Sequence, residues 1–222
     1  FNIYRPVYGN LAEPSLISAA QSDRSDELHS RSLYVKDNWH LNEQWIVVAG
    51  GRYQHFDQLV DQGRGNSYTK TTDRQDNAFL PFAGLVYQLN QQVSLYGNYS
   101  RSFVPNASDA NTSQAFDPEE GRSYELGVKL DLPRGIGASL ALFDIEKENV
   151  VVTNNAVSEA AGKVGSRGVE IDISGRIAER WELLGTYAYT DTEILDDLDN
   201  QGNALVNAAQ NIASLYLTHH LA

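Results

Sequence analysis

Hydrophobic and polar residues alternate with a period of two along unusually long segments of this chain. In the clearest case Tyr124, Leu126, Val128, Leu130 and Leu132 are separated by polar or small residues. Side chains of a β-strand point alternately to its two faces, whereas an amphipathic helix needs apolar residues three and four positions apart. The pattern therefore predicts strands.

Nine segments follow this pattern with varying clarity. They are residues 31–41, 44–58, 77–89, 92–104, 123–132, 136–152, 169–177, 181–193 and 208–222. Strands of soluble proteins usually have about 5–6 residues, and a tilted strand that crosses a bilayer needs about 9–11. The length of these segments favours a membrane barrel over a β-sandwich.

The connections between the segments alternate between short and long. The short ones are Asn42-Glu43, Asn90-Gln91, Pro133-Arg134-Gly135 and Ala178-Glu179-Arg180. The long ones are polar and cover about 59–76, 105–120, 153–163 and 194–207, while residues 1–30 indicate the end of an earlier strand and another long loop. Short periplasmic turns and long extracellular loops are typical of outer-membrane barrels.

Aromatic residues concentrate near both kinds of connection. Trp39, Trp45 and Trp181 lie close to short turns. Near the long loops lie Tyr53, Tyr99, Phe103, Tyr124, Tyr187 and Tyr189. Amphipathic rings at both ends of an apolar band are characteristic of membrane interfaces. The alternative is a set of core aromatics at the strand ends of a soluble protein.

Together these patterns predict an all-β fold that is part of a transmembrane, antiparallel, up-and-down β-barrel. Bacterial barrels have an even number of strands, and an open edge in lipid would leave backbone groups unpaired. The chain also has no Met and begins without a leader-like segment. We therefore expect residues 1–222 to be one partial barrel domain, with further strands supplied by sequence on both sides.

Composition excludes several other chemistries. The absence of cysteine rules out disulfides, thiolate zinc sites and a cysteine nucleophile. The net charge of −12 argues against nucleic acid as a partner. The five histidines are scattered, and His219 and His220 would point to opposite faces of a strand. No catalytic constellation emerges, so we expect neither an enzyme nor a resident metal or cofactor.

Several motifs follow each other in order along the chain. They include Gly51-Arg52-Tyr53, Phe116-Asp117-Pro118-Glu119-Glu120-Gly121, Tyr124-Glu125-Leu126-Gly127, Ser166-Arg167-Gly168-Val169-Glu170 and Tyr187-Ala188-Tyr189-Thr190-Asp191. This ordered set resembles the TonB-dependent siderophore receptors of the ferrichrome and ferrioxamine type. Two positions depart from the family pattern. Gln54 stands where the family usually has Asp, and Phe82 stands where it usually has Arg.

The resemblance implies a barrel of about 22 strands in the outer membrane of a Gram-negative bacterium. It implies import of a ferric siderophore, energised by the TonB complex through a plug domain that these residues do not include. Iron would enter only as ferric-siderophore substrate. Outer-membrane lipid and lipopolysaccharide would surround the barrel.

If the apolar residues face lipid, a set of charged residues faces the interior. These are Arg52, Glu125, Lys129, Asp131, Glu170, Asp172 and Arg176. They either pair across strands and with a plug or contact the ligand. Because the resemblance implies a ligand held near the extracellular mouth, the candidate substrate-binding residues are Arg52, Gln54, Phe56, Asn98, Ser100 and Arg167.

Two other function classes remain open at this point. A passive porin-like channel or a simple structural barrel would share the alternation, the girdles and the loop asymmetry. A soluble β-sandwich binding module is a more distant alternative, and folding in water without detergent would favour it. The sequence also leaves the nutrient open between siderophores, haem and cobalamin.

Overall fold

The computed structural model describes residues 23–64, 67–106, 116–154, 157–197 and 199–221, and these form nine strands and one short 3-10 helix. The strands are β1 (Asp23–His40), β2 (Trp45–Arg64), β3 (Ser67–Gln88), β4 (Val93–Val104), β5 (Glu119–Leu132), β6 (Ile136–Asn154), β7 (Val157–Ala178), β8 (Trp181–Asp196) and β9 (Asn211–His219). The 3-10 helix η1 (Pro133–Gly135) joins β5 to β6.

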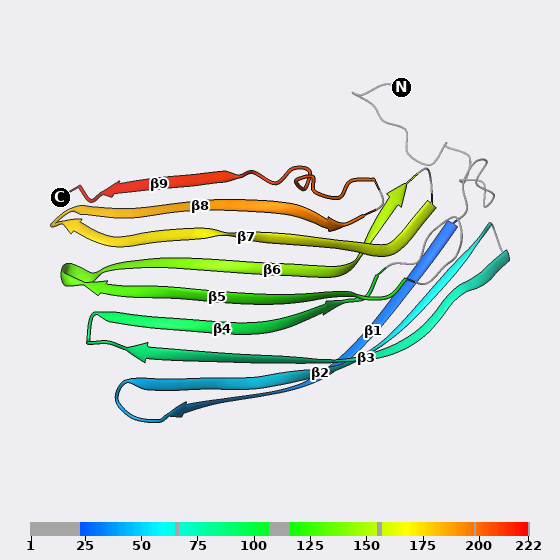
Figure 1. Ribbon diagram of the computed structural model, residues 1–222, viewed down its shortest axis with the longest axis horizontal. Helices are drawn as coiled ribbons and strands as arrows, with labels where there is room; N and C mark the ends of the chain where they lie inside the picture. Colours follow the sequence, from blue (N-terminus) through cyan, green and yellow to red (C-terminus); the bar gives the residue numbers. More distant parts are fainter. Residues whose placement is uncertain (1–22, 65–66, 107–115, 155–156, 198, 222) are drawn as a thin grey trace, which may run out of the picture. The chain divides into compact units, whose positions relative to one another are not determined.

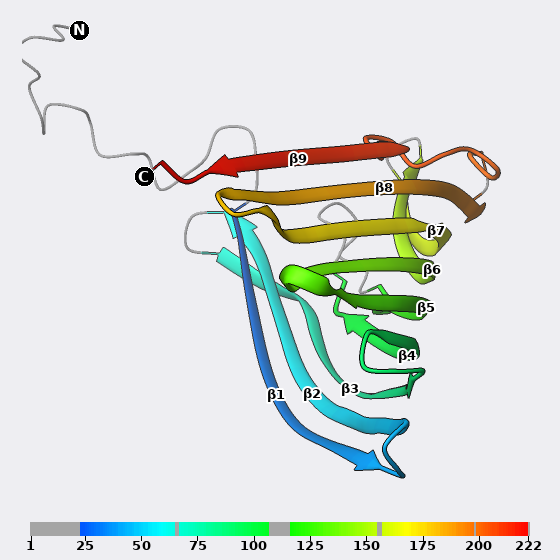
Figure 2. The ribbon, with the colours of Figure 1, turned by 90° about the vertical axis from the view of Figure 1, so that its left-hand side faces the viewer.

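The nine strands belong to one sheet and follow each other in chain order from β1 to β9. Each neighbouring pair from β3 to β9 is antiparallel. Figure 1 and Figure 2, which are related by a quarter turn, show β4 to β9 side by side in this order. The predicted all-β, up-and-down arrangement and its nine strands are confirmed for the described part of the chain.

The chain divides into two compact units. The larger unit comprises Ser32–Gln54, Asn77–Ala107 and Phe116–Ala222, and it therefore contains all of β4 to β9. The smaller unit comprises Phe1–Arg31, His55–Asp76 and Ser108–Ala115. In its described part Phe56 and Val60 are completely buried, and the Thr71 hydroxyl donates a hydrogen bond to the Val60 carbonyl at 3.1 Å.

The predicted short turns are confirmed. They occupy the gaps between β1 and β2, β3 and β4, β5 and β6, and β7 and β8. Two of them are held by an asparagine at the turn. The Asn42 side-chain oxygen accepts hydrogen bonds from the N–H groups of Gln44 and Trp45 at 2.8 and 2.9 Å, and that of Asn90 accepts one from Gln92 at 2.8 Å. We call the ends of the strands at these short turns the turn end of the sheet, and the opposite strand ends the loop end.

Two of the predicted long loops are wrong. Strand β2 runs to Arg64 and β3 starts at Ser67, so most of 59–76 is strand, and β6 and β7 likewise extend through most of 153–163. The segment 23–30, predicted as loop, belongs to β1. The strands continue beyond the apolar band because their N–H and C=O groups pair with those of the neighbouring strand. This backbone pairing does not require apolar side chains. Most of the loop predicted at 105–120 lies outside the described residues, between the end of β4 at Val104 and the start of β5 at Glu119. The loop predicted at 194–207 is confirmed for its described residues, since β8 ends at Asp196 and β9 starts at Asn211.

No helix among the described residues is both long and apolar enough to cross a membrane.

Candidate functional site

The two faces of the sheet in the larger unit differ in chemistry. One, here the apolar face, exposes large hydrophobic side chains to an extent unusual for a protein surface in water: Leu126 is 65% exposed, Leu142 52% and Ile171 43%. Antiparallel pairing sets Leu126 opposite Leu142 and Leu142 opposite Val169. A continuous exposed apolar surface of this kind marks contact with lipid or a partner.

The apolar face carries aromatic rings near both ends of its strands. At the turn end Trp45 stacks on Tyr87 with ring centroids 4.5 Å apart, and Trp181 lies 4.5 Å from the His219 ring. At the loop end Tyr99 and Tyr124 lie 5.0 Å apart. These ring pairs lie near the two ends at which the sequence places its aromatic residues. Phe103 also lies at the loop end of β4, but only 9% of it is exposed.

The opposite face, here the polar face, carries the alternate residues of the same strands. Cross-strand pairing sets Asn98 opposite Glu125, Ser94 opposite Lys129, and Ser139 opposite Asp172. The Ser139 hydroxyl and the Asp172 carboxylate are 3.3 Å apart, and Arg176 forms an ion pair with Glu182 at 3.6 Å. Pairing between strands, one of the two interpretations drawn from the sequence, thus accounts for Asp172 and Arg176.

Tyr96 is an aromatic residue of the polar face. It lies opposite Gly127, where an added Cβ would come within 2.5 Å of the Tyr96 ring. The missing side chain therefore lets the ring lie flat against the neighbouring strand. The Lys129 ammonium is 5.3 Å from the ring centroid, within the range of a cation–π interaction.

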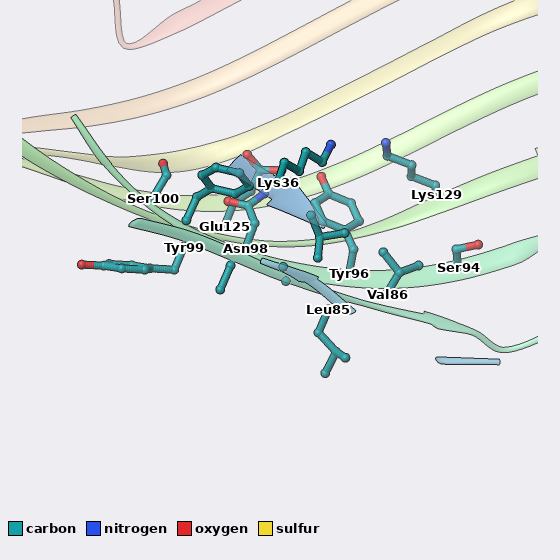
Figure 3. Close-up of a pocket in the computed structure, with 15 residues that line it drawn as sticks. Lys36, Leu85, Val86, Ser94, Tyr96, Asn98, Tyr99, Ser100, Glu125 and Lys129 are labelled. Atoms are coloured by element: carbon teal, nitrogen blue, oxygen red, sulfur yellow. The ribbon is translucent and has the colours of Figure 1, made fainter. Parts of the chain in front are cut away.

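A groove of about 680 Å³ runs along this face beside Tyr96. Its lining includes Lys36, Phe82, Asn98, Ser100, Glu125 and Lys129. Figure 3 shows Tyr96, Ser100 and Lys129 rising from one side of the sheet, while Leu85 and Tyr99 project to the other. Gly84 also lines the groove, and a Cβ at this position would make ordinary contacts with Val48 and Asn98.

Four of the predicted site residues lie on the polar face. Asn98 and Ser100 both line the groove. The ring of Phe82, a polar-face residue of β3, lies against Gly50 of β2. Strand alternation therefore puts Arg52 and Gln54 of β2 on the polar face as well. The Arg52 guanidinium donates a hydrogen bond to the Gln54 side-chain oxygen at 2.5 Å.

The other two predicted site residues lie elsewhere. Phe56 is fully buried in the smaller unit. Arg167 lies two positions from Val169 and opposite Asp191, whose carboxylate accepts its hydrogen bonds at 3.0 and 3.1 Å. The register therefore puts Arg167 on the apolar face, and its prediction as an interior-facing residue is wrong. The alternation of Val169 and Ile171 in the same strand was a signal for this in the sequence.

Sequence reasoning did not single out Tyr96 or Lys36, although both line the groove. A signal for Tyr96 was present, because it shares the alternation of Asn98 and Ser100 in the same strand. The residue that lets its ring lie flat, Gly127, is 31 positions away and becomes its neighbour only through pairing.

The groove combines apolar side chains such as Phe82 and Val86 with hydroxyl, amide, ammonium and carboxylate groups. Among the described residues no group of His, Asp or Glu side chains is arranged to hold a metal ion. The groove is thus suited to hydrogen bonds and ion pairs with the periphery of a polar molecule.

The sheet, its exposed apolar face and its aromatic ends define a segment of an outer-membrane β-barrel. The family model described as "TonB dependent receptor-like, beta-barrel" matches residues 1–221. The chain therefore belongs to the TonB-dependent receptor family, and it is located in the outer membrane of a Gram-negative bacterium.

Two curated relatives and one solved structure illustrate the similarity. The chain is 36% identical to the metal-pseudopaline receptor CntO of Pseudomonas aeruginosa, across 96% of this chain and 31% of that protein. It is 31% identical to the ferrichrome outer membrane transporter/phage receptor of Escherichia coli, across 83% of this chain and 25% of that protein. The crystal structure of the Pseudomonas aeruginosa ferripyoverdine receptor bound to ferripyoverdine matches with a TM-score of 0.69 and 25% identity, across 89% of this chain and 26% of that one. The chain thus spans about a third or less of the length of these proteins.

Proposed function

We propose that this chain is the barrel segment of an outer-membrane active transporter that imports ferric siderophores with energy supplied through TonB. The match of the family model to residues 1–221 carries the proposal. The names of the relatives, which include receptors or transporters for metal-pseudopaline and ferrichrome, support a metal chelate as the substrate class. The activity makes and breaks no covalent bond, so the protein is a transporter and not an enzyme.

The chemistry of the polar face fits such a substrate. A siderophore encloses its ferric ion with its own ligands, so a receptor needs groups that recognise the periphery of the chelate. The groove offers the Tyr96 ring, the Asn98 amide, the Ser100 hydroxyl and the Lys129 ammonium. Binding that favours one arrangement of the surrounding segments would shift their populations, and the TonB complex, acting through a plug domain, would then drive release inward.

The proposal is tested by uptake of radioactive iron supplied as different ferric siderophores. Cells that carry the parent gene are compared with a deletion strain, with and without an active TonB complex. We expect at least one ferric siderophore to enter only when both the gene and TonB are active. Uptake that needs the gene but is unaffected by loss of TonB would favour the passive channel instead.

We further propose that the polar-face residues Arg52, Gln54, Asn98 and Ser100 contact the substrate. Alanine at Asn98 or Ser100 removes one hydrogen bond each, which corresponds to a loss of roughly 3- to 10-fold in affinity. Binding of the ferric siderophore to the purified full receptor measures this. Alanine at Ser214, a hydroxyl residue of β9 outside the groove, is the control. Unchanged affinity on alanine replacement at each of the four positions would rule out the assignment.

We also propose that lipid and lipopolysaccharide contact the apolar face. Next to the Tyr99–Tyr124 ring pair, Arg101 pairs with Glu120 at 2.5 Å, and Arg167 pairs with Asp191. A charged row beyond an aromatic girdle lies at the depth of the lipid headgroups. Replacement of Arg101 and Arg167 by alanine is expected to lower the lipopolysaccharide that co-purifies with the full receptor. Equal amounts in variant and wild type would exclude a role for these two arginines.

A further inference from the structure

We propose that Asn106 and Asn149 form a clasp that joins the loop-end parts of β4 and β5 to the β6–β7 hairpin, so that the hairpin and the polar-face groove respond together to substrate. The part of this inference that concerns substrate rests on the proposed function. The clasp itself is defined by three hydrogen bonds between side-chain amides and backbone carbonyls.

Asn106 lies just beyond the end of β4 and donates two of these bonds. Its side-chain nitrogen is 2.6 Å from the carbonyl oxygen of Asp117 and 2.8 Å from that of Asn149. Asp117 lies just before β5, and Asn149 lies within β6. One amide group therefore links the end of β4 to the segment before β5 and to β6, which are 11 and 43 residues away.

Asn149 returns the third bond, from its own side-chain nitrogen to the carbonyl oxygen of Pro118 at 2.9 Å. Its backbone has a φ of 59°, in the left-handed region that asparagine and glycine tolerate best. The register between β6 and β7 shifts on both sides of Val150, which marks an irregularity in the ladder. The left-handed backbone conformation thus occurs at the residue whose carbonyl accepts a hydrogen bond from Asn106 and whose side-chain amide donates one to Pro118.

The surroundings hold this junction on both faces of the sheet. Phe116, next to Asp117, is only 5% exposed. On the polar face the Lys147 ammonium pairs with Glu119 at 2.8 Å. On the apolar face Arg122 pairs with Glu146, and Lys163 reaches the same carboxylate at 3.1 Å.

The position of the clasp links two functional regions. Strand β4 carries Asn98 and Ser100 of the groove, and β5 carries Glu125. The loop-end part of the β6–β7 hairpin turns away from the line of β4, β5 and β8, as Figure 1 shows. Both regions are therefore fixed to a single junction, and a shift of the hairpin moves the ends of the strands that carry the groove. Coupling of this kind requires a physical connection that both sites displace, and the clasp supplies one.

Hydrogen exchange measured by mass spectrometry on the full receptor in detergent tests the clasp without any ligand. Asn149→Gly keeps the left-handed backbone accessible but removes the amide donor, and Asn106→Ala removes the other two bonds. We expect either variant to speed exchange about 10-fold both in the hairpin and in the loop-end parts of β4 and β5. Asn207→Gly is the matched control, since Asn207 also has a positive φ of 60° but lies in the loop between β8 and β9, outside the clasp.

Faster exchange confined to the hairpin in Asn149→Gly, or to the end of β4 in Asn106→Ala, would overturn the clasp. The double variant should show little more than the larger single effect, because the bonds act as one network. Full additivity would count against a shared junction.

The link to substrate is tested in a separate experiment, which measures the affinity of the full receptor for the ferric siderophore that supports uptake. We expect a loss of roughly 3- to 10-fold in Asn149→Gly and none in Asn207→Gly. An unchanged affinity with altered exchange would overturn the link to substrate. A wild-type receptor that binds no ferric siderophore would instead overturn the proposed function, and the exchange measurement would still decide the clasp.

Discussion

Asparagine side chains fix the chain at the turn end and at the loop end of the larger unit, but through different atoms. At the turn end the side-chain oxygens of Asn42 and Asn90 accept hydrogen bonds from backbone N–H groups two or three residues away. At the loop end the side-chain nitrogens of Asn106 and Asn149 donate to carbonyl groups 11, 31 and 43 residues away.

The difference shows how one residue type serves two kinds of order. The bonds at the turns close within a single connection, so they form as soon as that connection folds. The bonds at the loop end need β4, β5 and β6 already in register, so they report on the assembled sheet. Turn asparagines are therefore visible as a local motif, whereas clasp asparagines are recognisable only when the strands have been paired.

Aspartate is nearly the same shape as asparagine but only accepts hydrogen bonds when ionised. At Asn106 or Asn149 it would set a carboxylate against backbone carbonyl oxygens and leave them without a donor. We expect Asn106→Asp and Asn149→Asp each to lower the free energy of unfolding of the full receptor by roughly 2–3 kcal/mol. Denaturant titration after refolding into detergent measures this. A loss no larger than that of a turn-end variant would contradict the donor role.

The same replacement at the turn end should be nearly neutral, because aspartate keeps the accepting oxygen. Asn42→Ala, which removes the acceptor for two N–H groups, is expected to lower the free energy of unfolding by about 1 kcal/mol. Asn42→Asp and Asn90→Asp are expected to stay close to wild type in the same titration. If aspartate is as damaging as alanine here, the turns depend on something other than the accepting oxygen.

The smallest effect is expected at Asp197, in the loop between β8 and β9. Its carboxylate accepts the N–H groups of Asp199 and Asn200 at 2.9 and 2.8 Å, and these bonds lower the pKa of Asp197 below its ordinary value. Since the pKa is lower in the folded than in the unfolded protein, the stabilisation is complete above the unfolded pKa of about 3.9 and is lost as pH falls through the folded value.

Amide exchange at Asp199 and Asn200, followed from neutral to acidic pH, measures this local stabilisation after correction for the intrinsic pH dependence of exchange. Protection should fall only below about pH 4. Asp197→Asn keeps the accepting oxygen but has no charge to titrate, so its protection should not change over the same range. Identical profiles for the two proteins would show that the carboxylate is not the titrating group.

Much of the architecture was predictable from the alternation alone. Leu126, Leu142 and Ile171 lie on one exposed face, and the short connections fall where Asn42, Asn90 and Pro133 predict them. The prediction failed at 59–76 and 153–163, where both faces of the strands are largely polar. Without an apolar face the period of two leaves no trace in the sequence, although the backbone still pairs.

The candidate site was predictable only in part, for a related reason. Asn98 and Ser100 share one parity within their strand, and both line the groove. Arg167 was misplaced, although Val169 two positions away belongs to the apolar face. Its position near a long loop suggested a site residue, whereas pairing with Asp191 holds this arginine on the apolar face beyond the Tyr99–Tyr124 pair.

The sequence by itself determined the strands, their turns, their two faces and the family, because alternation, turn chemistry and ordered motifs are properties of short stretches of chain. Only the tertiary structure decided that the Tyr96 ring lies flat against Gly127 and that Asn106 meets Asn149. Each of these contacts joins residues on different strands. Their geometry depends on the register between strands, which backbone pairing sets and no single segment encodes.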